Sequence, residues 1–180
     1  MRAMIASHLD APEPGVRRRR LQCLLYAGLV TGVTDGLFAS VLSVFFHSTP
    51  TRVFQGVAST VMGPRALEGG TATAAIGIAM HFGVAFGWST VFLLLDMRSS
   101  RVRTLVRSRY GALKAATLFG PAVWMTMSFA VIPLLVRRPP TITIRWWIQL
   151  AGHIPFVALP MITMIRQGAP RSPVAEPQRL

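Results

Sequence analysis

The stretch GLVTGVTDGLFAS, residues 28–40, contains the only full charge in a long apolar run that extends from Leu21 to Phe46. That charge is the carboxylate of Asp35. About 20 consecutive apolar residues are enough for a helix to cross the hydrocarbon core of a bilayer. A charged side chain in the middle of such a helix costs about 3 kcal/mol on insertion scales. The stretch therefore predicts a transmembrane helix that retains a carboxylate, and this carboxylate needs a partner.

The composition of the whole chain also indicates an integral membrane protein. Of its 180 residues, 52% are hydrophobic and only 14% are charged, whereas soluble domains carry roughly a quarter charged residues. None of the apolar runs alternates as a barrel strand would, so we expect helices, which satisfy their own backbone hydrogen bonds in lipid. Four runs are long enough to span: Leu21–Phe46, Thr71–Leu95, Gly111–Val136 and Trp146–Ile165.

These runs predict the fold class and the domain organisation. Residues 21–165 are expected to form one all-α membrane domain, an up-down-up-down bundle of four transmembrane helices with short connections. Residues 1–20 and 166–180 are polar and contain several Pro and Arg residues, so we expect disordered cytoplasmic termini there. Residues 96–110 are expected to form an arginine-rich cytoplasmic loop between the second and third spans.

The first outer connection, residues 47–70, is expected to contain a short amphipathic helix. Ser48 and Thr49 before Pro50 form a helix start signal, and Gly63 followed by a proline ends the segment. Apolar residues recur at helical spacing on one face. The opposite face carries Arg52, Gln55 and Ser59. Such a helix lies either in the outer membrane interface or across the ends of the spans.

The distribution of basic residues predicts the orientation in the membrane. A formal net charge of +13 would also suit a nucleic-acid-binding protein, but here the charges lie between the spans. If the N-terminus is cytoplasmic, the inner side carries Arg2, Arg17, Arg18, Arg19, Arg20, Arg98, Arg101, Arg103, Arg107, Arg109, Lys114, Arg166, Arg171 and Arg179. The outer side then carries only Arg52, Arg65, Arg137, Arg138 and Arg145. This asymmetry follows the positive-inside rule. It explains the basic residues, so we expect no nucleic acid as a partner.

The amino-acid usage also bears on the source and the location of the chain. Arginine is far more frequent than lysine, and Ala, Gly and Pro are abundant, as in proteins from GC-rich bacterial genomes. We therefore expect a multi-pass protein of a bacterial inner membrane, with both termini in the cytoplasm and the lipid bilayer as its main partner.

Small residues and prolines predict how the helices pack. Gly28, Gly32 and Gly36 repeat in the first span, and Gly83 and Gly87 in the second. This spacing lets helices approach closely, either within one chain or against a second copy or another membrane protein. The last two spans contain Pro121, Pro133, Pro155 and Pro160. Each proline frees a backbone carbonyl, which neighbouring helices can satisfy, and we favour a role in shaping the packing over a mobile half-bundle.

Three ionisable residues lie deep inside the predicted spans, and they are candidates for a shared polar centre. By helix rise, Asp35 is about 16 Å from the outer end of its span, His81 about 15 Å and His153 about 10 Å. Gln149 lies one turn before His153 on the same face. Asp35 shares the glycine face of its helix, within about 60° of Gly28 and Gly32. These side chains are therefore expected to converge and to hold or pass a proton near neutral pH.

Three functions remain open for this polar centre. It could bind a proton, a cation or a small polar ligand in a small transporter or permease-like component. The polar groups could instead only hold the bundle together, in a structural or accessory subunit of a membrane complex. Two histidines on different spans could also ligate a haem, although no attachment motif and no second histidine pair supports it. No local spacing supports a metal site, and no enzyme motif is present, so we expect neither an enzyme nor a bound cofactor.

Several stretches resemble a group of small four-helix bacterial inner-membrane proteins of unknown function. These are AGLVTGVTDGLFAS, TRVFQGVASTVMGPRALEGG, AIGIAMHFGVAFGW, YGALK, VIPLLVRRPP and AGHIPF. The resemblance covers residues 26–165 and includes Asp35, Arg52, Gln55, Ser59, Gly69, Gly70, His81, Pro133 and His153. The chain is more loosely similar to the YagU-like inner-membrane proteins, through the second-span histidine and the GH pair of the fourth span. Both resemblances imply a four-span fold, and neither implies an activity.

Overall fold

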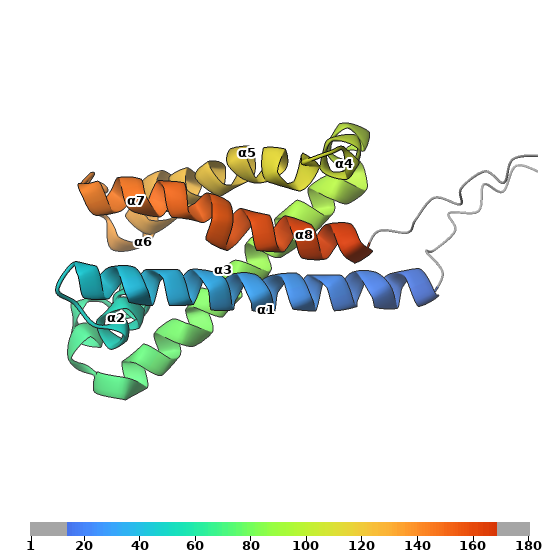
Figure 1. Cartoon of the computed structure of the whole chain (residues 1–180). Helices are drawn as coiled ribbons and strands as arrows, with labels where there is room; N and C mark the ends of the chain where they lie inside the picture. The colour runs from blue at the N-terminus through green and yellow to red at the C-terminus, as the bar shows by residue number, and fades with distance from the viewer. Residues whose placement is uncertain (1–13, 169–180) are drawn as a thin grey trace, which may run out of the picture.

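The computed structural model describes residues 14–168, and their regular structure is entirely helical (Figure 1). Four helical stretches are long and apolar enough to cross a membrane, namely Gly15–Phe45, Gly70–Arg98, Gly111–Val136 and Ile144–Gly168. The prediction of four long apolar helices is therefore confirmed. In chain order, the elements are α1 (Pro14–Phe45), α2 (Pro50–Met62), η1 (Pro64–Glu68), α3 (Gly70–Arg98), α4 (Ser100–Arg107), α5 (Gly111–Thr126), η2 (Met127–Val131), α6 (Ile132–Val136), α7 (Ile144–His153), η3 (Ile154–Ala158) and α8 (Leu159–Gly168).

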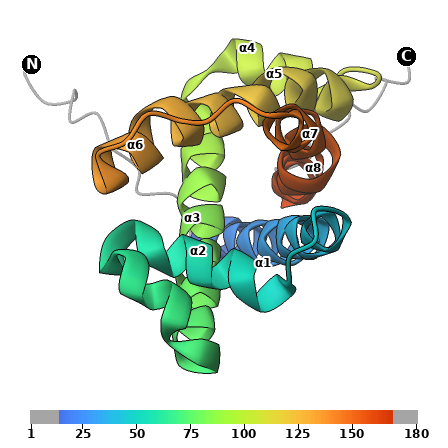
Figure 2. The same cartoon turned by 90° about the vertical axis from the view of Figure 1, so that its left-hand side faces the viewer.

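Helix α3 crosses the other long helices at a steep angle and packs mainly against α1 and α2 (Figure 1). Figure 2 shows α3 running from the side of α2, at the bottom, to that of α4 and α5, at the top. Helix α1 packs against both α3 and α8, and α5 packs against α7, η3 and α8. As a result α2 and α6 lie at one end of the molecule, and α4 lies at the other end with the beginning of α1 and the end of α8 (Figure 1).

The hydrophobic core lies towards the α4 end. Its fully buried members come from three of the four long helical stretches, and they are Ala27, Ala116, Ala158, Met161 and Ile162. Alanine at these positions lets the helices approach closely, and the two larger side chains of α8 fill the space that remains. The α2 end has no comparable cluster of buried residues within the described part of the chain. A cavity occupies that end instead.

The boundaries of the helical domain differ from the predicted ones. Residues 14–20 and 166–168 were expected to be disordered, but α1 begins at Pro14 and α8 ends at Gly168. Arginine is a good helix former, and extending an existing helix is far easier than starting one, so the arginines continue the adjoining apolar helix. The remaining predicted termini, residues 1–13 and 169–180, lie outside the described residues.

The predicted loop at residues 96–110 contains the short helix α4. Ser99 caps it by accepting a hydrogen bond from the backbone N–H of Val102, at 3.3 Å. Val106 is buried, so the helix has an apolar side that packs on the bundle. Arg103 donates to the last carbonyls of α3, those of Asp96 and Met97, at 2.9 and 2.7 Å. The serine cap and the apolar spacing were visible in the sequence, but the arginines between them were interpreted as a loop.

The short amphipathic helix predicted in the first connection is present as α2, but its polar side was assigned incorrectly. Thr49 caps its first turn, as the start signal predicts, and Gly63 ends it with φ 77°. Gln55 was expected on the outward polar face, yet it is only 5% exposed and donates to the carbonyl of Gly70 at 3.0 Å. Arg52 donates to the carbonyl of Leu67 at 2.6 Å, while Ser59 bonds within its own helix. The helix therefore packs on α3, and its side chains hydrogen-bond to the connection that follows it, residues 63–70.

The glycines of α1 receive side chains, whereas those of α3 do not. A Cβ atom at Gly28 or Gly32 would overlap the rings of Phe86 or Phe82 of α3, respectively. Gly83 and Gly87 were expected to pack as well, but no described residue outside their own helix lies within 4 Å of a Cβ added to either. Each glycine of α3 follows one of these phenylalanines in sequence. It is therefore turned about 100° away from α1.

The prolines of the last span accompany a turn of π-helix, η3, and helix α1 satisfies the backbone there. Pro160 cannot donate to the carbonyl of Phe156, four residues earlier. Instead, the hydroxyl of Thr34 on α1 donates to this carbonyl at 2.6 Å, and Thr31 donates to the carbonyl of Val157 at 3.5 Å. A second π-turn, η2, ends at Val131, two residues before Pro133. Resatisfaction of freed carbonyls by a neighbouring helix was expected from the sequence.

The close approach of α2 to α3 predicts a difference between two glycine substitutions. The added Cβ of Gly77→Ala would overlap the backbone of Phe54, and neither helix can yield locally. We expect this substitution to lower the free energy of unfolding by about 1–3 kcal/mol. Gly83→Ala, on the open side of the same helix, should be neutral or stabilising. Denaturation of the two purified variants in detergent tests this, and equal stability would contradict the packing of α2 on α3.

The threonine contacts of η3 predict a second difference. Thr34→Val keeps the shape of the side chain but leaves the Phe156 carbonyl without its donor, so it should cost about 0.6–1.7 kcal/mol of stability. The matched control is Thr90→Val, because the Thr90 hydroxyl is exposed and bonds only to Phe86 of its own helix. We expect the control to change stability by less than about 0.5 kcal/mol. The same denaturation assay compares the two variants. A Thr34→Val variant with the free energy of unfolding of the wild type would show that the contact does not support η3.

Candidate functional site

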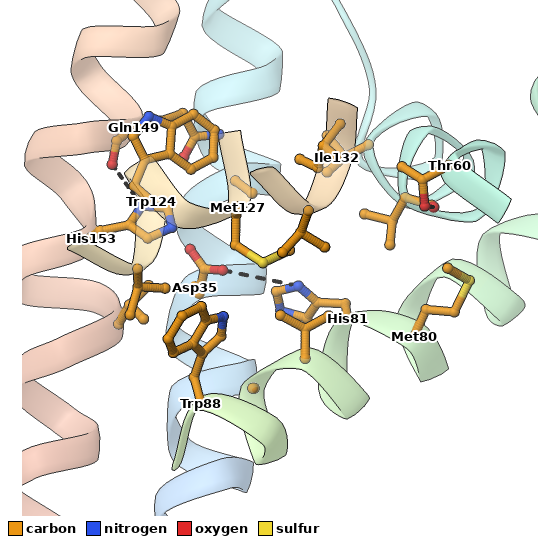
Figure 3. Close-up of a pocket in the computed structure, with 18 of the residues that line it drawn as sticks. Asp35, Thr60, Met80, His81, Trp88, Trp124, Met127, Ile132, Gln149 and His153 are labelled. Atoms are coloured by element: carbon orange, nitrogen blue, oxygen red, sulfur yellow. Dashed lines mark hydrogen bonds and ion pairs between the residues drawn. The ribbon is translucent and has the colours of Figure 1, made fainter. Parts of the chain in front are cut away.

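A cavity of about 250 Å³ lies at the α2 end, and all four long helical stretches contribute to its walls (Figure 3). Most of the lining is apolar. The polar lining includes the four residues that were predicted to converge: Asp35 from α1, His81 from α3, and Gln149 and His153 from α7. The structure thus brings the candidate polar centre together in one space. The glycine face of α1 accounts for this, because it turns Asp35 toward the bundle.

Asp35 and His81 face each other across the contact between α1 and α3. Oδ2 of Asp35 lies 4.0 Å from Nδ1 of His81, and the two side chains are 21% and 14% exposed, respectively. The other ring nitrogen of His81, Nε2, lies 2.9 Å from the backbone carbonyl oxygen of Gly32. His81 therefore joins two positions of α1 that are nearly one turn apart. The ring also lies beside Gly36, where an added Cβ would be 3.4 Å from Nε2, an ordinary van der Waals contact.

The carbonyl of Gly32 determines which ring nitrogen of His81 carries the hydrogen when the ring is neutral. A carbonyl only accepts, so Nε2 of His81 carries a hydrogen and donates it. If His81 is neutral, Nδ1 then presents a lone pair towards Asp35. A lone pair facing an ionised carboxylate is unfavourable, and one further proton, on either Nδ1 or Asp35, removes the conflict. Nδ1 is therefore the nitrogen of His81 that can take up a proton on the side of Asp35.

His153 lies on the opposite side of Asp35, so the carboxylate stands between two imidazoles (Figure 3). Its Nδ1 lies 2.7 Å from the backbone carbonyl oxygen of Gln149 and must donate to it. Nε2 of His153 is then free to interact within the cavity. In His81 the roles are reversed, since Nε2 donates to the backbone and Nδ1 is free. A close backbone contact positions this ring, because a Cβ at Gly120 of α5 would lie 2.6 Å from the carbonyl oxygen of His153.

Aromatic side chains form much of the wall around the acid, and the sequence reasoning missed them. Trp88 and Trp124 both line the cavity, together with Phe54 of α2. The Trp124 ring lies 4.8 Å from that of His153, and the Phe54 ring 5.8 Å from that of His81, centroid to centroid. One signal was available for Trp124: it repeats at a spacing of four with Gly120 and Ser128 along one face of the third span.

Two tryptophans near the cavity differ in how their N–H groups are satisfied. Trp146 is buried, and its indole N–H donates to the hydroxyl of Ser128 at 2.6 Å. The indole N–H of Trp124 is also buried, but it has no acceptor among the described residues. An unsatisfied buried donor costs about 1–3 kcal/mol. Such exceptions are concentrated at functional sites, and this donor belongs to a residue of the cavity wall.

Two turns of π-helix border the same cavity. Met127 and Val131 of η2 line it, and η3 begins directly after His153. The wide turns are marked by hydrogen bonds from Ile132 back to Met127 and from Leu159 back to Ile154. Turns of this type recur at functional sites because they change the direction of side chains without breaking a helix.

The other predicted residues lie outside the cavity. Gly28 and Gly32 receive phenylalanine rings of α3, Gly83 and Gly87 face away, and Arg52, Gln55 and Ser59 hold α2 and the connection after it. The residues do not favour a bis-histidine haem, since Nε2 of His81 already donates to the carbonyl of Gly32. Within residues 14–168, no three His, Cys, Asp or Glu side chains are grouped as a metal site requires.

Comparisons with protein-family models, curated proteins and solved structures found no match to this chain. The resemblance to small four-helix inner-membrane proteins therefore stays a prediction, and the interpretation of the cavity depends on its geometry.

The two carbonyl contacts predict opposite behaviour for the two histidines. As each ring gains or loses a proton, the nitrogen that changes should be Nδ1 in His81 and Nε2 in His153. NMR spectroscopy of protein with ¹⁵N-labelled histidine, in lipid nanodiscs, distinguishes these nitrogens by their chemical shifts. His81→Asn and His153→Asn variants assign the signals. Two rings that titrate at the same nitrogen would contradict the geometry.

Proposed function

We propose that this chain is a small proton-linked transporter, or a permease-like component, of a bacterial inner membrane. Its four long helices span the bilayer in an up-down-up-down order with both ends in the cytoplasm, and the Asp35–His81 pair holds the transported proton. The observation that supports this most directly is the cavity itself. It combines one carboxylate and two imidazoles, from three helices, inside walls that are otherwise mainly apolar.

The surface of the described residues supports insertion in a membrane. Large apolar side chains are exposed along the long helices, including Leu37 at 63%, Leu118 at 70% and Leu134 at 79%. Soluble monomers rarely expose extended apolar patches. Lipid acyl chains would cover these side chains. The charged ends of the spans follow the positive-inside rule, which supports a cytoplasmic location for Pro14 and Gly168.

The geometry of the pair supports proton transfer over a purely structural role. A hydrogen bond that only holds two helices together would show donor and acceptor in direct contact. Here Asp35 and His81 are 4.0 Å apart, and the contact between the helices is instead provided by the bond from His81 to Gly32. The carboxylate is thus left for a proton, a water molecule or a ligand.

A second function is favoured by one specific observation. Gly83 and Gly87 form an open strip on α3, where neither glycine has a partner among the described residues. Such a strip suits close packing against another transmembrane helix. It supports the alternative of an accessory subunit, or of a homo-oligomer. Crosslinking between cysteines introduced at Gly83 and Gly87 tests this second candidate in native membranes.

Proton flux into vesicles tests the proposed transporter. Protein is reconstituted in liposomes that contain a pH-sensitive dye, and a potassium diffusion potential drives proton entry. We expect wild-type protein to acidify the interior faster than empty liposomes do. Asp35→Asn should reduce the rate to that of empty liposomes, because the amide cannot carry the proton.

The matched control is Asp96→Asn, the same chemical change at the far end of α3. Asp96 lines a smaller pocket with Arg103 and Arg107, away from the proposed site, so its variant should keep the wild-type rate. Wild-type flux that does not exceed that of empty liposomes would contradict the proposal. A proton flux in Asp35→Asn equal to that of the wild type would show that the carboxylate is not needed for proton transport.

A further inference from the structure

The cavity contains the elements that recognise an organic cation with an apolar body. Its titratable lining groups are Asp35 of α1, His81 of α3 and His153 of α7, and the parts of α2, α5, η2 and α6 that line it contribute none. Asp35 is the only one that can be negatively charged. The other two can be neutral. The cavity can therefore present a net negative charge, but only by giving up the proton of the Asp35–His81 pair.

The walls around this acid are suited to a weakly hydrated positive charge. Asp35 lies near the indole ring of Trp88, and Trp124 lies beside it at the His153 end of the cavity (Figure 3). The faces of aromatic rings attract cations, most strongly where water is excluded. A bare metal ion would find too few ligands here, since the described residues group no three metal-binding side chains. An alkylammonium ion needs no such ligands.

The polarity of the cavity changes along its length. Asp35, Gln149 and His153 lie at one side, and Met80 and Ile132 at the other, with Thr60, whose hydroxyl bonds within α2 (Figure 3). A ligand that fits both sides has a charge at one end and an apolar group at the other. The volume of about 250 Å³ is just below the range of about 300–1,000 Å³ that is typical for drug-sized ligands. One ring with a small ammonium group suits this space.

We infer that the cavity binds a small lipophilic organic cation, and that binding expels the proton held between Asp35 and His81. The inference rests on the proposed function and names the class of ligand that the same site takes. The charges balance in this exchange. The pair with its proton is neutral, whereas ionised Asp35 beside neutral His81 carries one negative charge. One cation enters, one proton leaves for bulk water, and the net charge of the occupied cavity stays zero.

Benzyltrimethylammonium is a suitable probe because it has a permanent charge, one ring and no proton of its own. Neopentylbenzene is its uncharged isostere, with carbon in place of nitrogen, and benzylsulfonate is an anion of similar size. Each is titrated into detergent-solubilised wild-type protein by isothermal calorimetry, in two buffers with different ionisation enthalpies. The difference between buffers gives the number of protons released for each ligand bound.

We expect the cation to bind and to release about one proton, as linkage requires for a site that exchanges the two. Its affinity should fall as the pH is lowered, because protons then compete with the cation for the pair. The isostere should bind more weakly and release no proton, and Asp35→Asn should abolish the release. Equal binding of the isostere, binding of the sulfonate alone, or no binding of the cation would each overturn the inference.

A pair of variants tests the aromatic wall separately. Trp88→Leu should weaken cation binding by about 2- to 30-fold, whereas Trp88→Phe should lose less because it retains a ring face. Equal effects on the cation and on neopentylbenzene would overturn the role of the indole.

If Asp35-dependent proton flux occurs in vesicles but the cation does not bind, only the ligand class is wrong. If the cation binds and displaces a proton while flux does not depend on Asp35, only the transport proposal fails.

Discussion

The hydrogen bond from His81 to the backbone carbonyl of Gly32 is the interaction on which the rest of the site depends. It crosses from α3 to α1 at 2.9 Å, and it determines which nitrogen of the imidazole faces Asp35. Because the acceptor belongs to the backbone, no side-chain rotation can reverse its role. The carboxylate therefore faces a nitrogen that can take a proton, in surroundings that are mostly apolar and aromatic. The proton exchange and the cation binding proposed above both depend on this one constraint.

Glycine acts in three different ways around this site. On α1, Gly28 and Gly32 receive phenylalanine rings of α3. On α3 and α5, Gly77 and Gly120 allow backbone to approach backbone, from α2 and α7 respectively. On the far side of α3, Gly83 and Gly87 have no partner within the described chain. The same residue type at the same spacing thus packs against rings, packs against backbone, or stays open for another molecule.

Sequence reasoning predicted the long helices and the convergence of Asp35, His81 and His153, because hydropathy and helix rise fix the length and depth of a span. It could not predict the aromatic wall, since the rotation of α5 that turns Trp124 inwards depends on packing against α7. The burial of Gln55 was missed for a similar reason. A polar amide is expected to face solvent, and the sequence does not show that the carbonyl of Gly70 accepts its hydrogen bond. The helix at α4 was missed because its arginines were taken as evidence for a loop, although they are compatible with a helix.

The wide turn η3 contains one more residue than an α-helical turn would need. If that residue were absorbed into regular α-helix, everything after it would turn by about 100° and advance by about 1.5 Å. The side chains so displaced would include Met161 and Ile162, which are completely enclosed. Thr31 and Thr34 bind the carbonyls of this turn from the helix that also carries the acid. A change of register in the last helix would therefore act on the core and on the acid-bearing helix together.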